Sequence, residues 1–390
     1  MVHNVLLAAL LTAAVVAAAI PPPLSSFLAT SSSNPVSPEF LSNLHPDILQ
    51  AMEKFATDHV GSLSPGFRPH PPNSPPPLPS FYTVAHKKFK NEAMDITNKH
   101  ITVFYPVDYG EEVPAFRFLA YAHGFEGGGI QTAPGEVLQP FAKHSTLCRT
   151  NLSLLTHLCS WVVYWEMCMK IASFGYVVSL HHSCDVGCTR DDGELGFDDY
   201  YKEQLKSIEW GEMMFRSGNA AFKNLDWDSG VGVVGHSMGG QATLFSSAYN
   251  ATSHNIKAAV YQHAWTEDFP VPKVPFLSMT SVFDDEADAT TMGKAIYDIE
   301  GTDALTKGLV STADYGHHES DILGINPLMA QFTVAWMKVL MEGVTQETHE
   351  HTPADGVDWE AMIFGAGETS VCGGGDGAVD EQMCVISDTR

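Results

Sequence analysis

The chain has 390 residues, of which 44% are hydrophobic and 10% aromatic, so it can build a buried core and is not wholly disordered. It carries 46 acidic against 21 basic residues, a formal net charge of −25. Because binding to phosphate groups requires clustered lysine and arginine, this balance excludes nucleic acid and anionic membrane surfaces as expected partners.

The first residues have the pattern of a secretory signal. Residues 5–19 are apolar, and Ala17, Ala18 and Ala19 supply the small side chains of a cleavage site. We therefore expect a signal peptide over residues 1–19 and a secreted, extracellular or lumenal protein. His3 but no Lys or Arg precedes the apolar run, which leaves an uncleaved anchor as the alternative. The run is shorter than the ~20 residues of a typical span, and no other apolar run is long enough to cross a bilayer.

Residues 20–80 are rich in proline and serine and end in a proline cluster at 71–77. Such a composition favours extended polyproline segments and cannot build a core. We interpret the region as a linker or propeptide that precedes a catalytic domain over residues 81–342.

Short apolar runs and helical patterns alternate within residues 81–342. We expect strands at residues 101–107, 117–122, 176–180, 256–262, 275–281 and 309–313, with another from residue 231, and helices at 161–174, 198–216, 241–249 and 326–342. This alternation predicts an α/β fold with a mostly parallel central sheet and helices on both faces. Residues 343–390 are polar, acidic and rich in glycine, and we expect a tail outside the fold.

The chain has 7 cysteines, a number that agrees with export but leaves at least one thiol unpaired within the chain. Cys184 with Cys188, and Cys372 with Cys384, are each spaced to close a short loop. Cys168 lies in an apolar helical run and is the candidate for a buried free thiol.

Two glycosylation sequons begin at Asn151 and Asn250, and they can be used only in a secretory compartment. The cysteines lack the paired spacing of a zinc site. Acidic residues of the tail, Asp376, Asp380 and Glu381, do not have the spacing of a calcium-binding loop. We therefore expect no metal and no cofactor.

The most informative motif lies where the strand from residue 231 ends. Residues 235–239 read Gly-His-Ser-Met-Gly, the G-x-S-x-G pattern of a nucleophile elbow. Glycines at 235 and 239 suit a tight strand-to-helix turn that exposes the hydroxyl of Ser237. The same turn aims the amide of Met238, at the start of the next helix, toward a developing negative charge.

A serine hydroxyl needs a base and the base needs an orienting acid, and in α/β-hydrolases these follow in the order Ser, acid, His. Asp284 follows the strand at 275–281, with Asp285 as the alternative. His317 follows the last strand, with His318 as the alternative. We expect Ser237, Asp284 and His317 to be the catalytic residues.

A second oxyanion donor is expected after an early strand. The strand at 117–122 is followed by His123, Gly124 and Phe125, so the amide of Phe125 is the candidate partner of Met238.

These motifs resemble the α/β-hydrolase group that includes cutinases, polyester (polyethylene terephthalate) hydrolases, platelet-activating-factor acetylhydrolases and chlorophyllases. Residues 235–240 match the G-[HW]-S-M-G-G elbow of the polyester-hydrolase branch, and residues 123–125 fall where that branch has a glycine and an aromatic donor. Residues 274–277 lead into Asp284 at the family spacing, and residues 334–338 resemble the closing helix after His317.

The resemblance also implies substrate contacts. Residues 258–265 are similar to the stretch that ends in an aromatic clamp, which places Trp265 near the substrate, with Phe125 as a second apolar wall. Core packing is the alternative role for Trp265. Residues 131–161 are longer than the same region of compact cutinases, which is compatible with a lid.

The sequence thus predicts a secreted, monomeric serine carboxylesterase of the cutinase and polyesterase kind that acts on small-molecule or polymeric esters. A lipase or a chlorophyllase-type esterase with a lid is the alternative, although chlorophyllases carry Arg where this chain has Met238. A binding module on an inactive hydrolase fold is a third hypothesis; such modules typically lose a catalytic residue, and all three candidates are present.

Overall fold

A computed structural model describes residues 81–90, 100–107, 109, 115–124, 164–183, 197–312, 316–317, 327–344, 357–365, 372 and 379–389. All of these residues fall within one unit of the chain, residues 71–129 together with 163–390.

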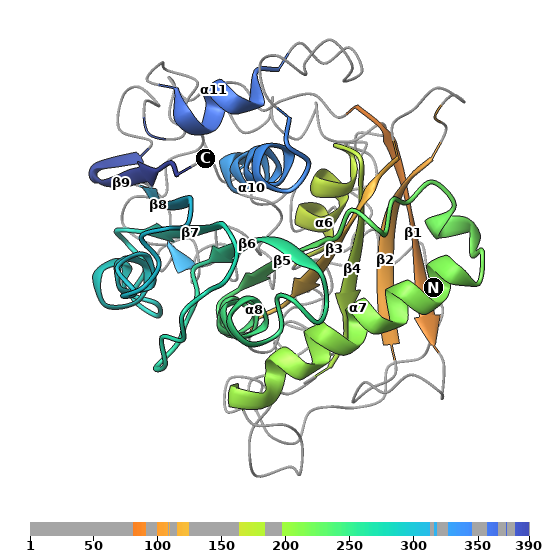
Figure 1. The fold of residues 1–390 in the computed structure, drawn as a ribbon, viewed down its shortest axis with the longest axis horizontal. Helices are drawn as coiled ribbons and strands as arrows, with labels where there is room; N and C mark the ends of the chain where they lie inside the picture. The colour runs from red at the N-terminus through yellow and green to blue at the C-terminus, as the bar shows by residue number, and fades with distance from the viewer. Residues whose placement is uncertain are drawn as a thin grey trace, which may run out of the picture. The chain divides into compact units, whose positions relative to one another are not determined.

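The centre of the fold is a nine-stranded sheet with the order β1-β2-β4-β3-β5-β6-β7-β8-β9 (Figure 1). The strands are β1 (Thr83–Lys90), β2 (His100–Val107), β3 (Arg117–Ala122), β4 (Tyr176–His181), β5 (Val231–His236), β6 (Ile256–Gln262), β7 (Phe276–Ser281), β8 (Lys307–Thr312) and β9 (Val379–Ser387). Every residue of β4, β5, β7 and β8 is buried, as expected for strands covered on both faces.

The prediction of a mostly parallel sheet holds only for its middle. Strands β4, β3, β5, β6, β7 and β8 pair in parallel, whereas β1 with β2, β2 with β4, and β8 with β9 pair antiparallel. Residues 91–99, between β1 and β2, are fewer than the dozen or more that a parallel crossover requires. The sheet is therefore mixed, with antiparallel strands at both edges.

Helices cover both faces of the sheet. They are α6 (Trp165–Ala172), α7 (Tyr200–Arg216), α8 (Met238–Tyr249), α9 (Ala295–Tyr297), α10 (Pro327–Leu340) and α11 (Trp359–Phe364), with short turns of helix at Phe197–Asp199, Ala220–Phe222 and Ala289–Lys294. Apolar residues of α6, α10 and α11 share one core cluster, and those of α7, α8 and α9 share the other. Figure 1 shows α10 and α11 on one side of the strands and α7 and α8 on the opposite side.

The expected tail contributes to the fold, which corrects the sequence analysis. Helix α11 packs with α10 in one cluster, and Trp359 is only 1% exposed. Its ring meets those of Phe174 and Phe81 edge-on, with centroids 5.8 and 6.3 Å apart. Strand β9 then pairs with β8 and extends the sheet. High polarity and glycine content concealed two short elements, of which α11 buries Trp359, Met362 and Ile363, and β9 keeps Cys384 and Ile386 half-buried.

The cysteines follow the prediction where the structure describes them. Cys372 and Cys384 form a disulfide, which ties residue 372 to β9. Cys168 is a free, buried thiol in α6. Cys184 and Cys188 lie outside the described residues. None of the helices in the described part of the chain is both long and apolar enough to span a bilayer.

Candidate active site

Ser237 stands between the end of β5 and the first residue of α8. Its backbone has φ 55° and ψ −121°, a strained conformation for a residue with a side chain. A Cβ at Gly235 would lie 2.0 Å from the carbonyl oxygen of Gly239, and one at Gly239 would lie 2.1 Å from that of Ala122. The turn therefore requires glycine at both positions, as the elbow motif predicts.

The structure brings Ser237, His317 and Asp284 into one hydrogen-bonded line. Nε2 of His317 is 2.8 Å from Oγ of Ser237, and its Nδ1 is 2.9 Å from Oδ2 of Asp284. Because an ionised carboxylate only accepts hydrogen bonds, Nδ1 of His317 carries the proton and Nε2 presents its lone pair to the Ser237 hydroxyl. This is the arrangement that a general base for serine requires.

Asp284 is buried, yet its surroundings favour the charged form. The amides of Glu286 and Ala287 donate to Oδ1 at 3.0 and 2.7 Å. Burial by itself raises the pKa of the Asp284 carboxyl, but hydrogen bonds from His263 and His317 outweigh it and hold that pKa well below the usual range. The carboxylate is therefore ionised at neutral pH and can stabilise an imidazolium.

The structure distinguishes the two acid candidates. Asp284 is buried against His317, whereas the side chain of Asp285 is exposed. His318, the alternative base, lies outside the described residues.

The predicted oxyanion donors are described in part. Met238 opens α8, so its amide lies at the positive end of a helix dipole, next to Ser237. Phe125 lies outside the described residues, which reach Gly124. Trp265 is half-buried, and its amide donates to the carbonyl oxygen of Ser237 at 3.1 Å. The backbone of Trp265 therefore lies beside the elbow.

A hydrogen-bonded chain that the sequence did not indicate joins the loops of the site. The amide of Gly124 donates to Oη of Tyr164 at 2.8 Å, Oη is 2.7 Å from Nδ1 of His236, and Nε2 of His236 is 2.8 Å from the carbonyl oxygen of His317. Since that carbonyl can only accept, Nε2 of His236 carries the proton, Nδ1 accepts from Tyr164, and Tyr164 accepts from Gly124. These hydrogen bonds thus connect the four chain segments that carry Gly124, Tyr164, His236 and His317.

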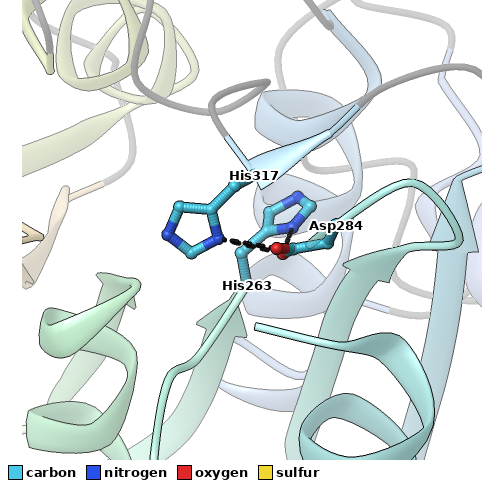
Figure 2. A group of neighbouring side chains, drawn as sticks. All are labelled: His263, Asp284 and His317. Carbon is cyan, nitrogen blue, oxygen red and sulfur yellow. Dashed lines mark hydrogen bonds and ion pairs between the residues drawn. The ribbon is translucent and has the colours of Figure 1, made fainter. Parts of the chain in front are cut away.

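His263 is a further functional residue that the sequence analysis did not identify. Its Nδ1 is 2.7 Å from Oδ2 of Asp284, so Asp284 lies between two imidazoles (Figure 2). With 18 histidines in the chain, residue type alone was uninformative. A usable signal was its position directly after β6, because active-site residues gather at the carboxyl ends of parallel strands.

Three more histidines lie buried at the carboxyl ends of β3 and β4. Burial lowers the pKa of His123 to about 4, although the carbonyl oxygens of Gly124 and Ser183, each 2.7 Å from a ring nitrogen, favour the charged form. The neutral ring donates its single N–H to one of these two oxygens. Burial also holds the pKa values of His181 and His182 well below the usual range. All three are therefore neutral at neutral pH.

The fold and the site together define a hydrolase of the α/β type: a sheet with a parallel centre, a serine on an elbow after β5, and acid and imidazole after β7 and β8. The family described as PET hydrolase-like matches residues 158–356, half of the chain, and the chain belongs to this family. The matched range includes Ser237, Asp284 and His317. The resemblance inferred from the sequence is thereby confirmed. A comparison with curated proteins finds no match.

Proposed function

We propose that the chain is a serine carboxylesterase that cleaves esters through an acyl-enzyme. The observation that carries this proposal is the continuous hydrogen-bonded line from Ser237 through His317 to Asp284, at 2.8 and 2.9 Å. Membership of a PET hydrolase-like family supports ester bonds as the target.

In the acylation step, Nε2 of His317 takes the proton of the Ser237 hydroxyl as Oγ attacks the ester carbonyl carbon. The amides of Met238 and Phe125 hold the resulting oxyanion, which is the charge that preorganised donors stabilise most. The C–O bond to the leaving group then breaks, and the alcohol departs with the proton from His317.

Deacylation repeats the sequence with water. His317 removes a proton from water as the water oxygen attacks the acyl carbon, and the second oxyanion collapses to the acid and free Ser237. In both steps the imidazolium faces the ionised Asp284, which stabilises its charge.

The surroundings of the site favour an apolar, uncharged ester. Val282 and Phe283, directly before Asp284, are 40% and 46% exposed, and Trp265 is half-buried beside the elbow. The carboxylate of Glu286 lies 3.7 Å from Nε2 of His317 and would repel an anionic acyl group. Aliphatic and aromatic esters, including polyesters, fit this description.

We also propose that the protein is exported. An apolar stretch at residues 5–19 supports this proposal, as does the Cys372–Cys384 disulfide, since such bonds persist in oxidising compartments. Expression of the full chain followed by assay of medium and cell fractions tests it; a chain that stays in the cell fraction with residues 1–19 attached would contradict it.

A series of p-nitrophenyl esters from acetate to palmitate, together with a polyester film, tests the catalytic proposal. Ser237→Ala and His317→Ala should each lower kcat by about 10⁴-fold or more, because the members of a triad act as a unit. Asp284→Asn should lower kcat by a comparable factor, whereas the matched Asp285→Asn should retain the wild-type kcat. Equal turnover by wild type and Ser237→Ala would exclude the mechanism. A strong preference for long acyl chains would identify a lipase rather than a short-chain esterase.

A further inference from the structure

One oxygen of the Asp284 carboxylate, Oδ2, accepts hydrogen bonds from two imidazoles. His317 and His263 both direct Nδ1 at Oδ2, from 2.9 and 2.7 Å (Figure 2). Two backbone amides donate to Oδ1, which also lies 3.1 Å from Nδ1 of His317. We infer that His263 is a positioning residue, which fixes Asp284 and thereby aligns His317 with Ser237. This inference rests on the proposed function, because it assigns a role in the same catalytic line.

The backbone shows that His263 is held in place for this contact. It follows the last residue of β6, and its amide donates to the carbonyl oxygen of Met279 in the neighbouring strand β7 at 2.7 Å. Its φ of 47° is in the left-handed region, which costs free energy for a residue with a side chain. Strain of this kind persists where surrounding contacts over-determine the conformation, and it clusters at functional sites.

The side chain is completely buried, so its contact with Asp284 is not shared with solvent. His263 has 0% exposure, and its ring lies 5.9 Å from that of His236 and 5.8 Å from that of His317. A charged imidazole at this position would oppose the positive charge that His317 acquires in each step. His263 is therefore suited to act as a neutral donor, with the proton on Nδ1 and the carboxylate as acceptor.

The same three residues offer ligand atoms of the kind that bind a metal ion, but their spacing is that of hydrogen bonds. Ligands about 2.0–2.2 Å from a tetrahedral zinc ion lie roughly 3.3 Å or more from one another. The Nδ1–Oδ2 distances of 2.7 and 2.9 Å are shorter, and each accommodates a shared proton.

Two consequences follow for catalysis. Without His263, the buried Oδ2 keeps a single side-chain donor, and the carboxylate is free to turn away from His317. The carboxylate also shares less of its negative charge, so the Asp284–His317 pair holds an added proton more tightly. Among the described residues, the other charged or titratable groups facing this pair are His236, Glu286 and Asp288. They are unchanged by a substitution at residue 263.

Three substitutions at residue 263 separate the effect of its hydrogen-bond donor from the effect of its packing and backbone strain. His263→Asn tolerates a positive φ and keeps an N–H near the position of Nδ1, His263→Leu keeps volume without a donor, and His263→Gly relieves the backbone without a donor. We expect the two donor-free variants to lose roughly 10- to 100-fold in kcat with little change in KM, because a hydrogen bond to a charged group is lost. The acid limb of their pH–activity profile should move to higher pH. His263→Asn should keep most of kcat and the wild-type profile.

A readout that needs no substrate distinguishes this inference from the proposed function. The proton on Nδ1 of His317 should give a downfield proton NMR signal in the wild type and in His263→Asn, and the signal should be lost or shifted in the donor-free variants. A folded donor-free variant with wild-type kcat, pH profile and signal overturns the inference, even if Ser237→Ala is inactive. A His263→Asn variant whose kcat falls as far as that of the donor-free variants also overturns the inference. Circular dichroism and thermal melts establish that each variant compared is folded.

Discussion

Ser237 occupies a backbone conformation that costs free energy, and its neighbours make the turn sterically possible. The carbonyl oxygens of Gly239 and Ala122 occupy the space that side chains at residues 235 and 239 would need. Ala122 ends β3, which lies in the middle of the sheet between β4 and β5 and therefore has little freedom to move. The position of the hydroxyl thus depends on contacts between β3, β5 and α8.

Gly239→Ala should consequently destabilise the protein strongly, because a Cβ 2.1 Å from the carbonyl oxygen of Ala122 forces backbone apart in the core. We expect a loss of about 3 kcal/mol or more in the free energy of unfolding. Gly218→Ala is the matched control: Gly218 has a φ of 73° but no atom within 4 Å of the position that an added methyl group would take, so strain alone should cost about 1 kcal/mol. Urea unfolding measures both, and equal midpoints would contradict the steric argument.

The sequence predicted the line Ser237, Asp284 and His317 because each residue stands at a defined place relative to a strand. The structure brings these three together. Tyr164 and His236 could not be recognised in the same way, because their roles depend on hydrogen bonds across 72 and 81 residues of sequence. His263 does follow a strand directly, but its contact with Asp284, 21 residues away, is not indicated by that position. Side-chain hydrogen bonds of this kind follow from tertiary packing and leave no periodic pattern.

Among the secondary structure elements, the central strands were the most predictable. β3 and β6 have the predicted bounds, and β2, β4, β7 and β8 differ from them by one or two residues. Continuous burial gives such strands an apolar sequence that is easy to recognise. The edge strands β1 and β9 were missed because half-exposed strands mix lysine, aspartate and glutamate with their apolar residues.

The C-terminal elements make a prediction at this scale. Trp359→Ala should lower the free energy of unfolding by about 3–5 kcal/mol, the usual cost of deleting a fully buried aromatic ring. Val385→Ala is the control, because Val385 lies on β9 but is 44% exposed. It should lower the free energy of unfolding by about 0.5 kcal/mol or less. Chemical denaturation compares the two. If Trp359→Ala is as stable as Val385→Ala, then α11 is dispensable for the fold.

The molecule as a whole combines high acidity with buried neutral histidines. The net charge is −25, so repulsion among surface carboxylates weakens once the pH falls below about 5 and they begin to bind protons. Burial acts in the opposite direction at His123, His181 and His182, whose pKa values in the folded state lie below the 6.5 of an exposed imidazole. At pH values between these lowered pKa values and 6.5, the unfolded chain binds protons that the folded chain does not bind.

Stability should therefore be complete above about pH 6.5 and should fall as the pH drops toward about 4, the folded-state pKa of His123. Each histidine that stays neutral in the folded state adds up to about 1.4 kcal/mol per pH unit to this slope. Urea midpoints measured from pH 7.5 to pH 5 test this, with the m-value as the control for a two-state transition. A midpoint that stays constant or rises on acidification would refute it.

The hydrogen-bonded chain from Gly124 through Tyr164 and His236 to His317 also has a consequence for biosynthesis. Its members leave the ribosome in that order, and the imidazole that faces Ser237 comes last, 80 residues after the serine itself. A nascent chain that already contains the elbow still has no base beside its serine. The hydroxyl of Ser237 therefore remains unactivated until the segment that carries His317 has been synthesised and has folded against the elbow.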